Sequence, residues 1–191
     1  MAFDEVTALL KQYEQMARER GSLAVDHLQP GLTPDELHQV EARYGFALSE
    51  DVKAIWSWHN GTGPVPSPNT PIDIGAGWRF IDLDSAIEYA QSVLSILNDG
   101  DADRYVFSRW VTFDRASRSD VIETSNPQIQ DSAVLVADIT SSVLTYPVLT
   151  VAEKLRWFIR AIESGAWYVD ERGEWQSNFD LYPTDAMRHI L

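Results

Sequence analysis

The chain of 191 residues contains no cysteine. This absence excludes disulfide bonds, thiol catalysis and zinc sites built on cysteine. The sequence also lacks any apolar run near the roughly 18–20 residues that a membrane-spanning helix requires. Asp4 and Glu5 stand where a secretory signal carries positive charge, so we expect a cytoplasmic protein with no membrane partner.

Positive charge is scarce as well. Lysine and arginine together number 15, against 29 aspartates and glutamates, and the formal net charge is −14. Because contact with phosphates needs clustered Lys and Arg, this balance opposes nucleic acid as a partner. It favours a basic partner through electrostatic steering, although acidity alone also keeps a protein in solution.

The familiar nucleotide-binding and catalytic motifs are missing too. The sequence has no GxxxxGK(S/T), no strand-borne GxGxxG, no HExxH and no GxSxG. Its four histidines are scattered, and no two of them have the spacing of metal ligands. We therefore expect no enzyme, no cofactor and no metal. A carboxylate-based hydrolase or metal enzyme that uses the acidic loops stays open as an alternative.

Acidic residues are abundant between positions 73 and 103, where seven carboxylates accompany a single base, Arg79. Residues 98–103, NDGDAD, superficially match a calcium-binding loop but lack the spaced glutamate that completes one. A solvated turn after a helix is one interpretation. The other is an acidic face for a basic partner, formed by Asp99, Asp101 and Asp103.

Hydrophobic periodicity and capping signals predict most of the elements. Helices are expected over residues 3–20, 34–44, 50–59, 85–97 and 151–164, and strands over 78–82, 104–114 and 133–139. Residues 115–131 are expected to form a polar loop. Helices come first, strands lie in the middle and a helix closes, which predicts an α+β fold with a mostly antiparallel sheet.

Residues 55–64, IWSWHNGTGP, pose a separate question, because tryptophans, a histidine and an asparagine run into a glycine turn. A helical step of roughly 100° separates Trp56 and Trp58 by about 200°, so only Trp56 is assigned to the core. Trp58 either packs under another element or lines a groove. Gly61 is expected to end the helix in a left-handed conformation, and His59 to cap and pack in its last turn.

Trp157 lies off the apolar stripe of the last helix, between Lys154, Arg156 and Arg160. We expect these neighbours to form an exposed polar face with the ring half covered.

Residues 32–63 resemble the opening of the SUKH superfamily, the group around the yeast cell-wall-assembly (glucan-synthesis) regulator. The likeness is carried by a helical glutamate, a Gly-aromatic link and a helix that ends in an aromatic and Asn-Gly. These are Glu41, Gly45-Phe46, Leu48-Ser49, Asp51 and Trp58-His59-Asn60-Gly61. Ser49 stands where proline is common. Pattern-level likeness extends the match to about residues 30–165.

The resemblance implies an α+β fold with a central mixed, mostly antiparallel sheet flanked by helices. We expect one domain over residues 1–191, with an N-terminal helical extension (1–26), a core (30–165) and a tail (166–191) that packs on the core. The family motif then assigns structural roles to Glu41, Gly45, Asp51, Asn60 and Gly61.

The resemblance also implies a non-enzymatic binding protein. Bacterial members are often immunity proteins that neutralise a cognate toxin, frequently a nuclease, by direct binding. We therefore expect a basic toxin as the partner, bound through Trp58, Trp78, Asp99, Asp101 and Asp103. The alternative is a regulatory or scaffold protein of the cell-wall or glucan-synthesis type, without a toxin partner.

Overall fold

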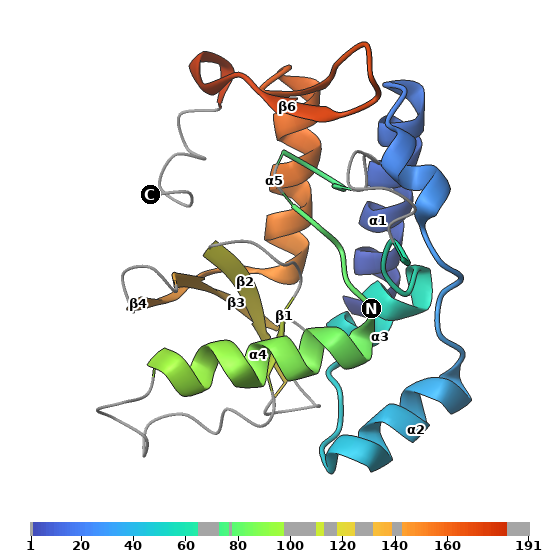
Figure 1. The fold of residues 1–191 in the computed structure, drawn as a ribbon, viewed down its shortest axis with the longest axis vertical. Coiled ribbons are helices and arrows are strands. Elements are labelled where there is room, and N and C mark those ends of the chain that lie inside the picture. Colours follow the sequence, from blue (N-terminus) through green and yellow to red (C-terminus); the bar gives the residue numbers. More distant parts are fainter. Residues whose placement is uncertain are drawn as a thin grey trace.

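The computed structural model describes residues 2–64, 73–76, 78–97, 110–112, 118–124, 132–138 and 143–182 (Figure 1). In chain order, its elements are α1 (Ala2–Glu19), the 3-10 helix η1 (Leu23–His27), α2 (Pro34–Tyr44), α3 (Glu50–Trp58), α4 (Leu83–Leu97), β1 (Trp110–Thr112), β2 (Arg118–Glu123), β3 (Ala133–Asp138), β4 (Val143–Thr150), α5 (Val151–Glu163), β5 (Trp167–Val169), β6 (Trp175–Ser177) and the 3-10 helix η4 (Phe179–Leu181).

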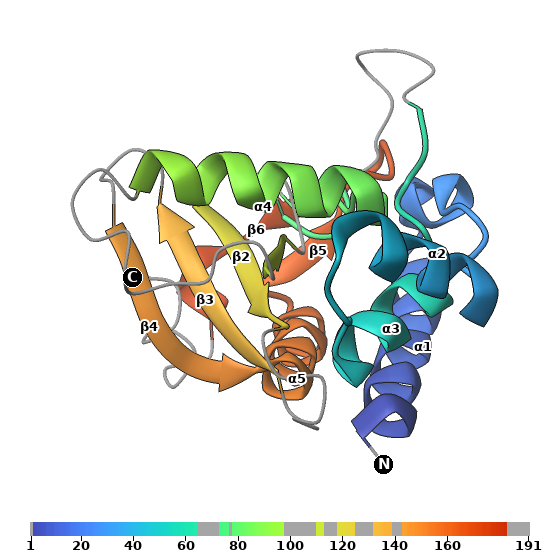
Figure 2. The ribbon, with the colours of Figure 1, turned by 90° about the horizontal axis from the view of Figure 1, so that it is seen from below.

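The sheet confirms the predicted α+β class. Strands β1 to β4 lie in sequence order, and each described pairing is antiparallel. A register shift between Val134 and Val136 bends the pairing of β3 with β4. In Figure 2 the strands run between α4 on one side and α5 on the other. Strands β5 and β6 form a separate antiparallel hairpin.

The helical layer is held together by α1, which packs against both α3 and α5 (Figures 1 and 2). Its buried positions follow the predicted helical spacing, with Val6, Leu10, Tyr13 and Ala17 all at most 2% exposed. They join a core shared with the apolar faces of α3, α4 and α5. No helix in the described part of the chain has the length and apolar character needed to cross a bilayer.

Capping sequences set the helix starts as expected. Two capping boxes form, with Thr33 and Glu36 opening α2 and Thr150 and Glu153 opening α5. Helix α2 ends at Gly45, which adopts φ of 75° in the left-handed region.

Two strand assignments differ from the sequence-based ones. Residues 78–82 form no strand, because Trp78 and Phe80 make only isolated bridges. Conversely, β2 lies within the expected polar loop at residues 115–131. Because the first half of β2 is polar, its sequence does not show the alternation of apolar and polar residues that is typical of a strand. Val121 and Ile122 are nevertheless buried, at 0% and 1% exposure, between the neighbouring strands. Helix α4 begins at Leu83 and not Ser85.

The expectation for Trp157 was wrong, since its ring is only 2% exposed. The chain after α5 turns back over this face of the helix. Trp167 packs edge-on against Trp157 at 5.3 Å, and Tyr182 stacks on it at 6.0 Å. Lys154 is buried beside it, with its ammonium 4.6 Å from the centroid of Trp78. Helical periodicity alone could not reveal this second buried face.

A substitution at Trp157 tests the packing of the β5–β6 hairpin on α5. We expect Trp157→Ala to lower the free energy of unfolding by about 3–5 kcal/mol, because it removes a large buried ring. Glu163→Ala, at an exposed position of the same helix, should change it by less than about 0.5 kcal/mol. Urea denaturation followed by circular dichroism measures both. A loss below about 1 kcal/mol for Trp157→Ala would contradict the burial.

Candidate functional site

The candidate site is a groove of about 940 Å³ beside the family-like motif. Its walls come from residues 29–32, 60, 62–64 and 79–82, together with Glu36 of α2 and Ser85, Glu88 and Tyr89 of α4. We call it the α2–α4 groove. Phe80 and Thr62 in its lining are 0% and 3% exposed, so part of the groove rests directly on the core.

The segment after α3 forms one wall, and it is tied to the chain that leads into α4. The Trp56 indole N–H donates to the carbonyl of Ile81 at 3.1 Å. Asn60 Oδ1 accepts the N–H of Leu83 at 3.0 Å, which satisfies a free donor in the first turn of α4. The N–H and hydroxyl of Thr62 both donate to the carbonyl of Phe80 at 3.1 Å.

The same segment is tied on its other side to residues 29–32. Asn60 N–H donates to the carbonyl of Gln29, whose own N–H donates to the carbonyl of Gly61 at 2.9 Å. The chains approach so closely that a Cβ on Gly31 would lie 1.9 Å from the carbonyl oxygen of Ser57. Glycine is therefore required at position 31 by space and not by backbone angle.

Gly61 combines both requirements. Its φ is 80°, and a Cβ there would lie 2.6 Å from the N–H nitrogen of Asp82. The sequence-based assignment of Gly61 as the helix stop was incomplete. Helix α3 ends at Trp58 because His59 turns to extended backbone, with φ of −150°, and bridges to Pro30. Gly61 instead allows this segment to run in close contact between residues 29–32 on one side and residues 80–83 on the other.

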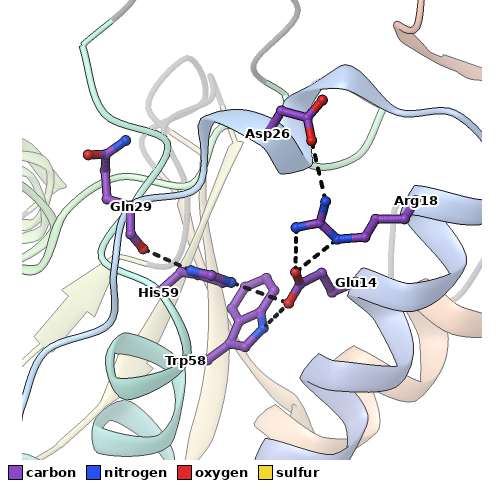
Figure 3. Close-up of polar contacts among 6 residues, drawn as sticks. All are labelled: Glu14, Arg18, Asp26, Gln29, Trp58 and His59. Carbon is purple, nitrogen blue, oxygen red and sulfur yellow. Dashed lines mark hydrogen bonds and ion pairs between the residues drawn. The ribbon is translucent and has the colours of Figure 1, made fainter.

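A polar network lies behind this wall (Figure 3). Glu14 of α1 receives the indole N–H of Trp58 at 2.8 Å and contacts His59 Nε2 at 3.2 Å through the same oxygen. Its other oxygen accepts a hydrogen bond from the Arg18 guanidinium at 2.8 Å, and Arg18 also donates a hydrogen bond to Asp26 at 3.3 Å. Glu14 and Arg18 together thus link α1, η1 and the end of α3.

The second ring nitrogen of His59 connects the network to the groove. His59 Nδ1 lies 2.8 Å from the carbonyl oxygen of Gln29, a residue of the groove wall. Since a carbonyl only accepts, Nδ1 carries the proton of this bond. Both ring nitrogens therefore hold structural contacts, which agrees with the expectation that His59 caps and packs.

The ionisation of Glu14 responds to this setting. Burial by itself raises its pKa, but the hydrogen bonds from Arg18, Trp58 and His59 outweigh burial and hold the pKa below its usual value. The carboxylate is thus stabilised in its charged form by Arg18 and Trp58, and by His59 when both of its ring nitrogens carry a proton.

The motif residues named from the sequence occupy defined structural positions. Glu41 accepts the N–H of Leu48 at 2.8 Å and so fixes the link between α2 and α3. Asp51 is 1% exposed and accepts the N–H of Ser132 at 2.5 Å, which ties α3 to the start of β3. Asn60 and Gly61 likewise join chain segments, whereas Gly45 ends α2.

The residues assigned to partner binding are more dispersed. Trp58 is partly buried, stacked on Phe80 at 5.8 Å with its N–H given to Glu14. Trp78 is also partly buried, with Lys154 over its ring. Asp99, Asp101 and Asp103 lie outside the described residues, so their role stays a prediction. Among the described residues, no group of three or more His, Asp and Glu side chains could hold a metal ion.

Sequence reasoning missed Glu14 and the groove. Glu14 occupies an ordinary polar position in an amphipathic helix, and nothing in its neighbours signals a contact 44 residues away with Trp58. Gly31 carried a usable signal, since a glycine just before a capping box has no helical role. The groove depends on three chain segments that meet only in the fold.

Comparison with known families identifies the class of domain. The SMI1 / KNR4 family (SUKH-1) matches residues 31–129, just over half of the chain. The chain belongs to this family, which confirms the resemblance seen in its sequence. The likeness suggested for residues 130–165 lies beyond the match and stays a prediction. A search of curated proteins found no match.

The dual role of Gly61 can be tested against Gly45, which has nearly the same φ. A Cβ at Gly45 meets nothing within 4 Å, so Gly45→Ala should cost only the left-handed strain of about 1–2 kcal/mol. Gly61→Ala adds overlap with the backbone of residues 81–82 and should cost about 1–3 kcal/mol more. Urea denaturation gives the two values. Equal losses would contradict the close approach.

The Glu14 network predicts a pH dependence. Because the folded pKa of Glu14 is lowered, its contribution to stability is complete above the ordinary value of 4.5 and is lost as pH falls through the folded pKa. Glu14→Gln should lose about 1–2 kcal/mol at neutral pH. The difference between Glu14→Gln and the unsubstituted chain should shrink below pH 4.5.

Thermal or urea unfolding at several pH values measures this difference. Glu19→Gln, at an exposed position of the same helix, is the matched control and should track the unsubstituted chain throughout. A gap for Glu14→Gln that stays constant down to strongly acidic pH would contradict the network.

Proposed function

We propose that this chain is a non-enzymatic protein-binding domain of the immunity type, which neutralises a cognate bacterial toxin in the cytoplasm by direct binding. Membership of the SMI1 / KNR4 family carries the proposal, because domains of this family typically bind protein partners. The net charge of −14 supports a basic partner such as a nuclease, since an enzyme that holds nucleic acid needs clustered positive charge.

The structural role of the motif also supports a binding function without catalysis. His59, which precedes Asn60 of the groove wall, uses both ring nitrogens for contacts with Gln29 and Glu14. A general base would need one nitrogen directed at a reacting proton. The groove provides a concave surface with charged side chains, and these are what recognition of a partner requires.

The proposal is tested with the product of a toxin gene next to the gene of this chain. We expect the purified chain to form a tight complex with that product by calorimetry and to abolish its toxicity on co-expression. Failure to bind it and failure to protect would together contradict the immunity function.

Steering by Asp99, Asp101 and Asp103 is a separate prediction. Changing Asp99, Asp101 and Asp103 to Lys should slow association about tenfold or more at low salt, because long-range attraction is reduced. The effect should shrink at about 1 M salt, where charges are screened beyond roughly 3 Å. Stopped-flow fluorescence measures the rate. An association rate unchanged at low salt removes these residues from the interface.

The second candidate is a regulatory or scaffold protein of the cell-wall or signalling type. The same family match supports it. It is distinguished by affinity capture with the full chain: recovery of housekeeping enzymes, together with a gene neighbourhood that encodes no toxin, favours this role.

A further inference from the structure

We infer that the α2–α4 groove binds an extended segment of the protein partner that carries Arg or Lys side chains. The inference rests on the proposed function, because it names the part of a partner that the domain recognises. It assigns recognition to a described surface formed by α2, α4 and residues 60, 62–64 and 79–82.

The charges of the groove favour a cation. Its lining includes three carboxylates, Glu36, Asp82 and Glu88, and one guanidinium, Arg79. Arg79 is directed to Asp73, outside the lining, at 3.9 Å, which offsets its own charge. The groove therefore has an excess of negative charge in addition to that of the whole chain.

Each of these carboxylates directs only one of its oxygens to a partner among the described residues. Glu36 uses Oε2 for the Thr33 cap, Asp82 uses Oδ1 for the Ser85 N–H, and Glu88 uses Oε1 for the Tyr44 hydroxyl at 3.4 Å. Within the described part of the chain, the contacts of each carboxylate involve a single oxygen. A guanidinium or ammonium group can bind the other oxygen through a charge-assisted hydrogen bond.

The apolar part of the lining favours a peptide over a free ion. Leu32, Phe80, Ile81 and Tyr89 lie among the carboxylates. Arg and Lys carry an aliphatic stem below the charged head, so one side chain can cover apolar surface and still reach a carboxylate. A volume of about 940 Å³ lies at the upper end of the roughly 300–1,000 Å³ range of ligand pockets, which leaves room for more than one side chain.

The wall of the groove is organised before binding. Residues 60–62 are hydrogen-bonded to Gln29 on one side and to Phe80 and Leu83 on the other. A fixed wall lowers the entropic cost of association, because the protein loses little conformational freedom when the partner binds.

A labelled peptide of twelve residues that alternates Arg and Ser tests the inference, with a Glu-Ser peptide as the chemical control. Fluorescence anisotropy at about 150 mM salt gives the dissociation constants. We expect the Arg-Ser peptide to bind and the Glu-Ser peptide not to bind. Glu88→Lys, on the exposed face of α4, should weaken Arg-Ser binding about tenfold or more.

The matched control is Glu163→Lys at an exposed position near the end of α5. It changes the net charge by the same amount but lies outside the groove lining, so binding should weaken by no more than about twofold. Circular dichroism confirms that both variants fold. Equal weakening by the two variants, or no weakening by either, overturns the inference.

Toxin protection by the same variants separates this inference from the proposed function. Protection by the unsubstituted chain and by Glu163→Lys, but not by Glu88→Lys, supports both. Full protection by all three overturns the groove and leaves the immunity function standing. Groove-specific peptide binding without any protection supports the groove and contradicts the immunity function.

Discussion

The path of residues 56–62 is the constraint on which the other segments of this domain depend. This segment passes between residues 29–32 and residues 80–83 and exchanges hydrogen bonds with both. The passage is so narrow that positions 31 and 61 have no space for a Cβ. Because the donors and acceptors are partly or fully buried, a shift of this segment would leave several of them unpaired at about 1–3 kcal/mol each.

The N-terminal helix shares in this constraint although it precedes the family match, which begins at residue 31. Glu14 reaches from α1 to Trp58 and His59, and through His59 to the carbonyl of Gln29. Helix α1 also packs on α3 and α5. The wall of the groove is therefore supported from behind by a part of the chain that the family pattern does not include.

The local signals in the sequence predicted the local structure. Capping boxes, helical periodicity and the apolar run of β3 each depend on residues close in the chain, and they placed both ends of four of the five α-helices within one position. Helix α4 begins two residues earlier than expected because Asp82 and Asn60 both satisfy its first turn. Asn60 is 23 residues away, so no local pattern contains that information.

The wrong predictions also arise from contacts between residues that are distant in the sequence. Trp157 was assigned to a half-exposed face because its neighbours in the helix are charged, yet the hairpin at residues 167–177 covers it. β2 was missed because its two apolar residues, Val121 and Ile122, are adjacent and so point to opposite faces of the sheet, after three polar positions. The candidate site was hardest to foresee, since its walls come from segments separated by about 20 to 30 residues and meet only through tertiary contacts.

The arrangement separates the residues that build the fold from those that can select a partner. Trp56, Asn60 and Thr62 direct their polar groups to the backbone of residues 80–83, so exchanging them disturbs the core. Glu88 is exposed at the groove, and surface substitutions of this kind usually change stability by less than about 0.5 kcal/mol. A fixed wall with an adjustable charge on α4 lets partner preference change without rebuilding the domain. Specificity then depends on where like charges are placed as much as on attraction, because a cation at position 88 repels the segment that a carboxylate would bind.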